Sequence, residues 1–278
     1  MSLLKTDAIC NQIYSEIETT ITDWNSPPHL AIVMLGQQQA SMKFVALKKK
    51  QAQKLGYNCS TFHLPDKTNK QHIIELIAEL NSDKDITGII VQLPLPPHLN
   101  AWEITNQICP QKDVDCLSAS RMGQFLTGNH TIMPGTAQAI SILCAHYSIE
   151  TTGKNVAIIG ASNLVGKPAA IWFLHQNATV TVCHQFTTNL QSIVSSADII
   201  ISATGQSDLI TENWLNQNQI IIDIGIQIKD GKTIGDLDSS RLVQVVQHIT
   251  PVPGGIGPLT VAVLMQNLAH LYLNQVKK

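Results

Sequence analysis

Three side chains around position 45 have the types and spacing of a site for a flat ligand that exchanges a proton. Ser41, Phe44 and Lys48 lie at positions i, i+3 and i+7 of a helical pattern, which places them on one helix face. An aromatic ring beside an amine can hold a planar heterocycle while the amine moves a proton. Taken singly, Lys48 also fits a solvated lysine, because it begins a run of three lysines.

Two further polar groups follow in the same half of the chain. Gln92 ends an apolar run and directly precedes the proline-rich segment 93–97. Asp115 closes the loop sequence KDVD at 112–115. A carboxylate in a loop is usually solvated, so Asp115 identifies no site by itself. The joint order of these groups after Lys48 is what favours a common site.

A glycine-proline loop precedes the last helical pattern of the chain. Residues 250–260 read TPVPGGIGPLT. Prolines fix φ, and glycines adopt conformations closed to other residues, so main chain can approach a ligand closely here. The segment predicts a ligand-contacting loop, with a plain tight connector as the alternative.

A strand-turn-helix pattern in the second half suits a dinucleotide. An apolar run ends at Gly160, and the residues GASNLVGKP at 160–168 lead into a helical pattern. Backbone N–H groups and the positive end of a helix at such a turn suit a pyrophosphate. The spacing differs from G-x-G-x-x-G, so a plain strand-to-helix turn is the alternative. Segments 203–205 and 222–226 also end buried runs in small residues, which favours a flat ligand at that edge.

Apolar runs rich in Val and Ile alternate with helical patterns along the chain. We expect strands at 29–35, 57–63, 87–92, 155–159, 178–183, 198–202 and 219–223, and helices at 41–55, 69–80, 137–146, 165–175, 190–196 and 259–275. Strands without polar alternation predict parallel sheets covered on both faces. The pattern therefore predicts an α/β fold of two lobes, the second of them Rossmann-like with a parallel sheet. The boundary is expected at 121–135, where we find no periodic pattern, and the C-terminal helix is expected to return to the first lobe.

Composition excludes several classes of protein. The 278 residues are 44% hydrophobic and 14% charged with a net charge of −2, which is typical of a globular protein and argues against nucleic-acid or membrane partners. The six cysteines are scattered without metal-ligand spacing, so we expect no metal site and reduced thiols in the cytoplasm. We find no signal-peptide core and no window of roughly 18 apolar residues.

Taken in order, these segments resemble the methylenetetrahydrofolate dehydrogenase/cyclohydrolase family, the bifunctional FolD proteins. The motifs are SxxFxxxK (41–48), VQLPLP (91–96), KDVD (112–115), GxSxxVGxP (160–168), CH (183–184), DIG (223–225), GDLD (235–238) and TPVPGGIGP (250–258). They span nearly the whole chain at family-like spacing. The resemblance implies a two-lobe, homodimeric enzyme of one-carbon metabolism. Such an enzyme oxidises 5,10-methylenetetrahydrofolate with NADP and hydrolyses the methenyl product to 10-formyltetrahydrofolate.

The resemblance also implies residue roles and domains. Lys48 matches the family's catalytic lysine, Gln92 the glutamine bonded near it, and Asp115 the carboxylate that anchors the pterin. The implied substrate contacts also include Phe44, Pro253 and Gly254, and the implied dinucleotide contacts are Gly160, Ala161, Ser162, Val165, Gln185, Ile226 and Thr260. The implied domains are a folate-binding catalytic domain at 1–134, with 262–278 packing back on it, and a Rossmann-like NAD(P)-binding domain at 135–261.

Several positions depart from the family pattern. Phe44 replaces a tyrosine and keeps the stacking face without the hydroxyl, and Cys116 replaces a glycine. At the cofactor end, Ala161 stands where an arginine is usual, and Gln185 and Phe186 replace a serine and a basic residue. A 2′-phosphate needs cationic or multiple hydrogen-bond donors, so these changes predict a weak preference for NADP over NAD.

Two alternatives from other classes remain open at this point. A degenerate, non-catalytic folate-binding or regulatory protein would explain the cluster of departures. A different two-lobe dehydrogenase, such as a shikimate-dehydrogenase-like enzyme, would require the folate motifs to be coincidental. Turnover of methylenetetrahydrofolate would exclude the first, and the motifs PVPGG at 251–255 and VQLPLP at 91–96 argue against the second.

Overall fold

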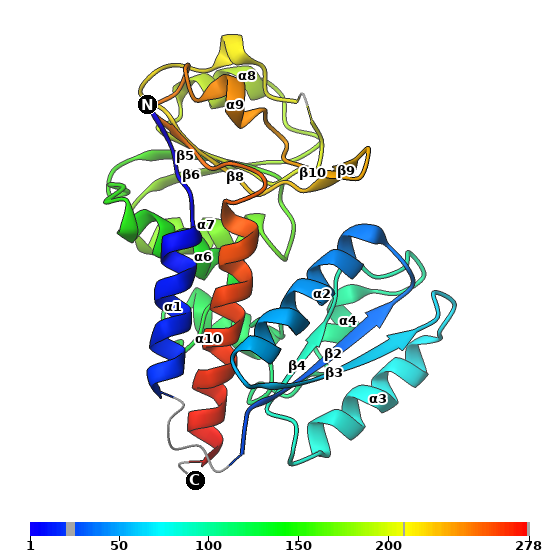
Figure 1. Cartoon of the computed structure of the whole chain (residues 1–278). Helices are drawn as coiled ribbons and strands as arrows, with labels where there is room; N and C mark the ends of the chain where they lie inside the picture. The colour runs from blue at the N-terminus through cyan, green and yellow to red at the C-terminus, as the bar shows by residue number, and fades with distance from the viewer. Residues whose placement is uncertain (21–25, 208, 277–278) are drawn as a thin grey trace. The chain divides into compact units, whose positions relative to one another are not determined.

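The computed structural model describes residues 1–20, 26–207 and 209–276, which form two compact units. Unit 1 comprises Met1–Asn11 and Thr136–Thr260, and unit 2 comprises Gln12–Gly135 and Val261–Lys278. The chain passes between them within helices α1 (Asp7–Thr20) and α10 (Ile256–Val276) and at the start of α6 (Gly135–His146) (Figure 1). The first residues belong to unit 1 because β1 (Ser2–Leu3) pairs with β11 (His248–Ile249).

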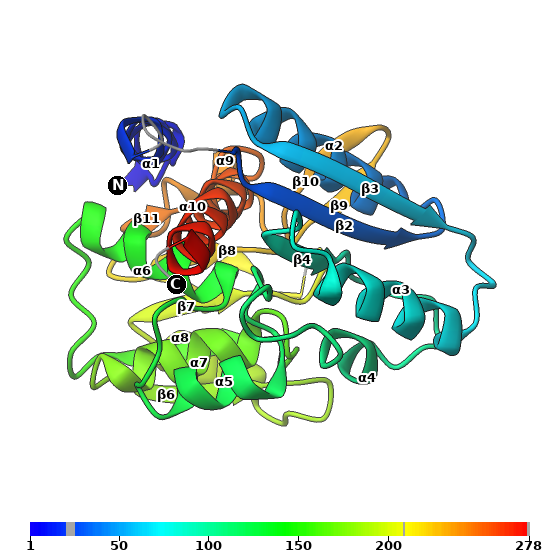
Figure 2. The same ribbon diagram turned by 90° about the horizontal axis from the view of Figure 1, so that it is seen from below.

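Unit 2 is built on a three-stranded parallel sheet. Its order is β3 (Asn58–Leu64), β2 (His29–Leu35) and β4 (Gly88–Val91), with β2 in the centre. Helix α2 (Gln39–Lys54) covers one face, and α3 (Lys70–Ser82) with the short α4 (Ala101–Thr105) covers the other (Figure 2). Burial on both faces explains why β2 reads as a continuous apolar run.

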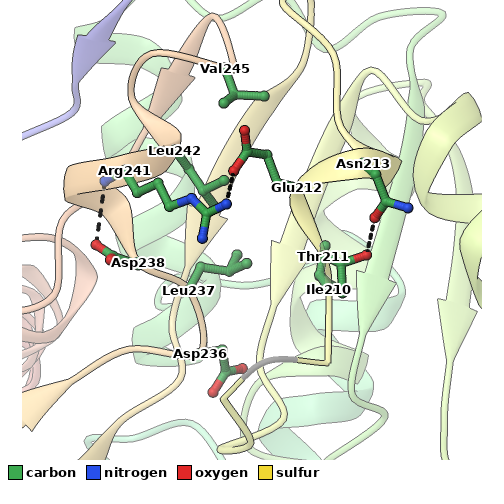
Figure 3. A pocket seen from close by; sticks show the side chains of 10 residues that line it. All are labelled: Ile210, Thr211, Glu212, Asn213, Asp236, Leu237, Asp238, Arg241, Leu242 and Val245. Carbon is green, nitrogen blue, oxygen red and sulfur yellow. Dashed lines mark hydrogen bonds and ion pairs between the residues drawn. The ribbon is translucent and has the colours of Figure 1, made fainter.

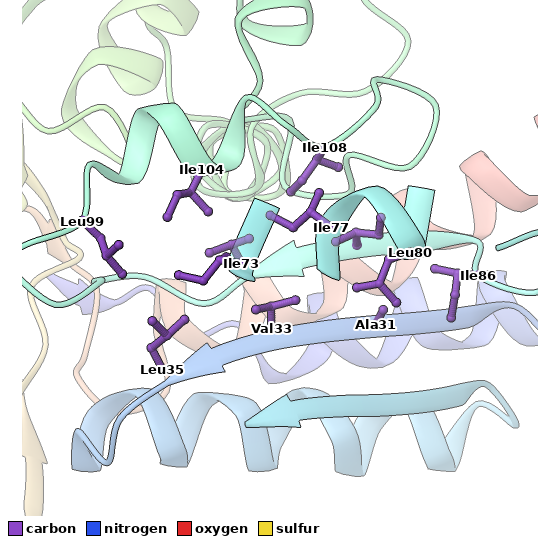
Figure 4. Close-up of a cluster of buried hydrophobic side chains, with 12 residues drawn as sticks. Ala31, Val33, Leu35, Ile73, Ile77, Leu80, Ile86, Leu99, Ile104 and Ile108 are labelled. Atoms are coloured by element: carbon purple, nitrogen blue, oxygen red, sulfur yellow. The ribbon is translucent and has the colours of Figure 1, made fainter. Parts of the chain in front are cut away.

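The α3 face of this sheet holds the hydrophobic core of unit 2. Ile73, Ile77 and Leu80 lie at helical spacing on α3 and pack over Ala31 and Val33 of β2 (Figure 4). Leu35, Ile86, Leu99, Ile104 and Ile108 close the cluster from its sides. Asn69 begins α3 by accepting a hydrogen bond from the N–H of His72, which supplies a cap for the exposed helix end.

Unit 1 contains a six-stranded parallel sheet. Its order is β1, β11, β8 (Ile220–Asp223), β7 (Ile199–Ser202), β5 (Asn155–Ile159) and β6 (Thr179–Cys183). Helices α6 and α7 (Gly166–His175) lie on one face, and α8 (Leu190–Ser196) and α9 (Ser239–Leu242) on the other (Figure 1). The chain adds β6 on one side of β5 and then crosses to β7 on the other side. This switch point at the carboxyl end of β5 is where open α/β sheets bind ligands.

Some elements differ from the sequence expectation. The stretch 121–135 is not free of regular structure, because α5 (Ala119–Leu126) occupies its start. Phe125 is the one buried residue of α5. A helix of about two turns with a single buried residue shows no repeating apolar pattern in its sequence. The expected strands and helices also omit α1, the 3-10 helix η1 (Glu212–Trp214), and the antiparallel hairpin of β9 (Gln227–Lys229) and β10 (Lys232–Ile234).

Helix α10 corrects the expectation that no apolar window is long enough for a membrane span. Its most apolar 18 residues have a mean hydropathy of 1.3, which passes the length and composition test. However, 67% of that window is buried inside the protein, as in a core helix. Within unit 2, Asn267 Nδ2 donates to Val114 O at 3.1 Å and Gln275 Nε2 donates to Thr87 O at 3.0 Å. The C-terminal helix therefore returns to the first lobe, as expected.

Truncating Ile77 tests how much the α3 core contributes to stability. Ile77→Ala leaves a cavity, so we expect the free energy of unfolding to fall by about 2–5 kcal/mol, whereas Ile77→Val should cost about 0.5–1.5 kcal/mol. Glu79→Ala, on the exposed side of the same helix, should change it by no more than about 0.5 kcal/mol. Urea denaturation of the four proteins measures this, and equal losses for Ile77→Ala and Glu79→Ala would contradict the packing described.

Candidate functional site

The buried face of α2 carries a lysine. Ser41, Val45, Lys48 and Ala52 are the buried residues of this helix and recur at helical spacing, so the amine of Lys48 lies on the side turned away from water. Phe44 is half-buried on the same helix. Of the three residues expected on one face, Ser41 and Lys48 are therefore buried, and Phe44 is half-buried.

Gln92 is the hydrogen-bond acceptor for the Lys48 amine. It follows β4 directly, and its backbone N–H donates to Val33 O at 2.8 Å, which extends the sheet pairing by one residue. Lys48 Nζ donates to Gln92 Oε1 at 3.0 Å. Gln92 Nε2 donates to Leu93 O at 2.8 Å, so the side-chain oxygen is held toward the amine. This hydrogen bond thus joins the end of β4 to the buried face of α2, two elements far apart in the sequence.

Asp115 is presented by a loop that Asp113 shapes. The loop runs alongside β4, where Ile89 N–H donates to Lys112 O at 2.7 Å. The buried carboxylate of Asp113 accepts from Ser118 N at 2.7 Å and from Leu117 N at 3.3 Å, which turns the chain back after Asp115. The residue at this turn, Cys116, has φ of 58°, the left-handed conformation that glycine adopts most easily.

The electrostatics of this group lower the pKa of the Lys48 amine from its ordinary value. Burial lowers the pKa of Lys48, and the negative charge of Asp115 opposes that shift in part. Burial raises the pKa of Asp115, and Lys48 pulls it back. Each group therefore depends on the other for its charge. A lysine with a lowered pKa has more neutral amine at neutral pH, which a proton-accepting role requires.

Ser41, expected on the same helix face but without an assigned role, adds a polar atom to the site. Its Oγ is buried and has no hydrogen-bond partner among the described residues. A buried hydroxyl normally finds a partner, so an orphan on the face that carries Lys48 is a group available to a ligand. The sequence signal was its spacing of seven residues from Lys48.

The turn after β5 forms a close main-chain approach in unit 1. Gly160 has φ of 116°, and a Cβ there would lie 2.3 Å from Ala203 O, so only glycine fits. Ser162 is exposed, and its Oγ accepts from Val165 N at 3.1 Å just before α7 begins. Ala161 and Val165 are half-buried. The N-terminus of α7 and this turn fit an anionic group, which supports a dinucleotide at the switch point.

The end of β6 offers little positive charge. Gln185 is exposed, and Phe186 is 78% exposed. The N–H of Phe186 donates to His184 Nδ1 at 3.2 Å. The nearby Lys167 on α7 bonds Asn163 Oδ1 through Nζ at 2.7 Å. The acidic or basic residue that usually selects between NAD and NADP is not at this strand end.

The remaining expected residues lie around the last loop of unit 1. Gly254, with φ of 101°, and the following Gly255 accept hydrogen bonds from Thr6, which ties the loop to the N-terminal segment. Pro253 is exposed, and Thr260 Oγ1 donates to Gly257 O at 2.7 Å. Ile226 follows β8 and is half-buried. Pro253 and Gly254 thus belong to unit 1, whereas Lys48, Gln92 and Asp115 belong to unit 2.

Two surface cavities are lined by other residues. One, of about 720 Å³ in unit 2, lies at Gln37, Asp66, Lys67 and the prolines after β4. The other, of about 560 Å³ in unit 1, lies between η1 and α9, where Arg241 pairs with Glu212 at 2.6 Å (Figure 3). Neither lining includes an expected site residue. Arg241 is exposed and Glu212 is partly exposed, so this ion pair contributes little to stability.

Comparison with known families covers both units. The model of the tetrahydrofolate dehydrogenase/cyclohydrolase catalytic domain matches residues 4–115, and the model of the NAD(P)-binding domain of the same family matches residues 134–276. The chain belongs to the tetrahydrofolate dehydrogenase/cyclohydrolase family.

Relatives of this family match over the full fold. The bifunctional protein FolD of Lactobacillus acidophilus is 43% identical over 248 residues, which are 89% of this chain and 88% of the relative. A crystal structure of the bifunctional enzyme FolD from Campylobacter jejuni superposes with a TM-score of 0.92 at 34% identity and covers 99% of both chains. FolD of Trypanosoma brucei, solved with NADP and an inhibitor, gives 0.93 at 29% identity over 99% of this chain and 98% of its own.

Shikimate dehydrogenases share only the fold with this family member. The enzyme of Aquifex aeolicus has a TM-score of 0.57 at 8% identity over 92% of this chain and all of its own. The folate motifs are therefore not coincidental, and the shikimate-dehydrogenase-like alternative is set aside.

A titration of the Lys48 amine tests the electrostatics of this folate-family site. We expect its pKa below the ordinary lysine value, and we expect Asp115→Asn to lower it further, because the substitution removes the charge that favours the ammonium form. NMR of labelled lysine side chains measures both values. Asp85→Asn, at an exposed position, is the matched control and should leave the Lys48 pKa unchanged. An ordinary pKa, or no response to Asp115→Asn, would contradict the coupling.

Proposed function

We propose that this chain oxidises 5,10-methylenetetrahydrofolate to the methenyl form with NAD(P) and hydrolyses that product to 10-formyltetrahydrofolate, using Lys48, Gln92 and Asp115. The observation that carries the proposal is the buried amine of Lys48 held at 3.0 Å by Gln92, in a chain whose two halves match the two domain models of this family. Nothing among the matches favours a degenerate, non-catalytic alternative.

Lys48 serves as the proton carrier of the hydrolytic step. Its neutral amine takes a proton from the water whose oxygen bonds to the methenyl carbon. The bond from that carbon to N5 then breaks while the ammonium returns a proton to N5, and the hydroxyl on the carbon releases its proton to solvent, which leaves the formyl carbonyl on N10. Gln92 holds the amine in place through its carbonyl oxygen, since its own amide hydrogen is engaged by Leu93.

Asp115 and Phe44 orient the substrate. The carboxylate of Asp115 accepts hydrogen bonds from the amino and ring N–H groups of the pterin, a directed contact that fixes the one-carbon bridge beside the amine. Phe44 provides a half-buried ring for stacking without the family's hydroxyl. The family resemblance assigns Pro253 and Gly254 to substrate contacts as well.

The dinucleotide is held by unit 1. Gly160, Ala161, Ser162 and Val165 form the turn that receives the pyrophosphate at the start of α7, and Gln185, Ile226 and Thr260 complete the contacts. A dinucleotide held by these residues would supply the acceptor for the hydride of the methylene carbon. We take NADP as the first cofactor, with a weak preference over NAD.

The same proposal includes the domain roles and the assembly. The folate-binding catalytic domain is 1–134 with 262–278, and the NAD(P)-binding domain is 135–261. The family resemblance implies a homodimer working in the cytoplasm.

Replacing Lys48 tests the assignment of the hydrolytic step. Lys48→Met keeps the aliphatic stem and removes the base, so we expect the rate of methenyltetrahydrofolate hydrolysis to fall by about 10²- to 10⁴-fold. Lys49→Met, at the adjacent exposed position, is the matched control and should retain nearly the full rate. A Lys48→Met protein that hydrolyses the substrate at the wild-type rate would refute the role.

Side-by-side oxidation assays with NADP and NAD test the cofactor site. Without a charged partner for the 2′-phosphate, and without a carboxylate for the ribose of NAD, we expect kcat/KM values within about tenfold of each other, a gap of about 1.4 kcal/mol. Strong NADP selectivity, in the wild-type protein and in His184→Ala alike, would show that another group binds the phosphate.

A further inference from the structure

Two carboxylates are buried side by side at the carboxyl edge of the unit 1 sheet. Asp223 ends β8 and is 1% exposed, and Asp236 follows β10 and is 3% exposed. Neither forms a salt bridge within the described ranges 1–20, 26–207 and 209–276. Hydrogen-bond donors must therefore compensate both groups, and the identity of those donors shows what the pair holds in place.

Asp223 binds the turn that carries its partner. Its Oδ1 accepts from Gly225 N at 3.0 Å and from Asp236 N at 3.3 Å, and its Oδ2 accepts from Leu237 N at 2.9 Å. Burial, with a smaller contribution from the neighbouring Asp236, raises the pKa of Asp223 to about 7. Asp223 thus fixes where the carboxylate of Asp236 is placed.

Asp236 directs its bonds at the loop after β7. Its Oδ2 accepts from Ser202 Oγ at 2.9 Å, Thr204 N at 2.8 Å and Thr204 Oγ1 at 2.8 Å. Its Oδ1 is buried without a hydrogen-bond partner in the described part of the chain, against Gly225, where a Cβ would lie 1.9 Å away. One oxygen therefore gathers three donors from two residues of a single segment.

The segment 202–204 packs directly against the turn at Gly160. Ala203 N–H donates to Ile159 O at 2.8 Å, and Ala203 O occupies the space that a Cβ on Gly160 would need. Thr204 Oγ1 also accepts from Gln206 N at 3.1 Å, which fixes the course of the loop beyond it. The carboxylate, Thr204, Ala203 and Gly160 thus form a continuous series of contacts from the buried pair to the switch point.

We propose that Asp236 is a positioning residue for dinucleotide binding, acting through Thr204 and the Ala203 peptide on the Gly160 turn. This inference rests on the proposed function. A carboxylate oxygen accepts three donors, two of them from one residue, better than a neutral amide oxygen does, because hydrogen bonds to an ionised acceptor are stronger. An asparagine would also turn an N–H₂ group, or a weaker acceptor, toward the loop.

The test separates the dinucleotide step from the folate step. Asp236→Asn should raise the Kd for NADP, measured by calorimetric titration, by about tenfold, and raise the KM for NADP in step. Hydrolysis of supplied methenyltetrahydrofolate, assayed without dinucleotide, should stay within about twofold of wild type, because Lys48, Gln92 and Asp115 all lie in unit 2. Asp238→Asn, at an exposed position two residues on, is the matched control and should retain wild-type NADP binding.

Thr204→Val supplies an independent variant that keeps the carboxylate. Thr204→Val should weaken NADP binding. Both substitutions remove the same contact between Thr204 and Asp236. The Kd of the double variant for NADP should therefore not exceed the higher of the two single-variant values. Wild-type NADP affinity in Asp236→Asn or in Thr204→Val overturns the inference. Parallel loss of NADP binding and methenyltetrahydrofolate hydrolysis in Asp236→Asn, with a lowered melting temperature, also overturns it in favour of a purely structural role. A wild-type chain that binds neither NADP nor NAD overturns the proposed function itself.

Discussion

The hydrogen bond between Lys48 and Gln92 is the interaction on which the chemistry of unit 2 depends. Burying an amine costs free energy unless a partner is supplied, and here the partner is a neutral amide oxygen at the end of a buried strand. A carboxylate in direct contact would have kept the lysine charged. Burial is the larger effect and lowers the pKa of Lys48, and the negative charge of Asp115 opposes that shift only in part.

Both units use buried carboxylates to accept main-chain N–H groups of loops next to their parallel sheets. In unit 2, Asp113 accepts hydrogen bonds from two backbone N–H groups and thereby shapes the loop that carries Asp115. In unit 1, Asp223 and Asp236 do the same for the segments around the Gly160 turn. Buried carboxylates that bind main-chain N–H groups rigidify loops, so loops otherwise free to move hold fixed positions beside the ligand sites.

Periodicity in the sequence predicted much of the fold. The runs at 29–35 and 155–159 and the helix at 190–196 match β2, β5 and α8 residue for residue, because long apolar runs and strong helical spacing are local signals. Elements stabilised by distant partners were missed: β1 is two residues long and exists through its pairing with β11. Helix α1 had a signal, since Ile9, Ile13 and Ile17 are buried one turn apart. The order of the motifs predicted Lys48, Gln92 and Asp115 as site residues. That the Ser41 hydroxyl has no hydrogen-bond partner among the described residues, and that Asp236 bonds Thr204, follows only from the structure.

Product analysis of the wild-type protein tests the central claim most directly. The purified chain is supplied with 5,10-methylenetetrahydrofolate and NADP, and reduced dinucleotide, methenyltetrahydrofolate and 10-formyltetrahydrofolate are followed over time. Two activities in one chain predict reduced dinucleotide and 10-formyltetrahydrofolate in equal final amounts, with the methenyl form consumed faster than in buffer. No reduced dinucleotide above the enzyme-free blank, or a methenyl product that decays no faster than in buffer, would contradict the account.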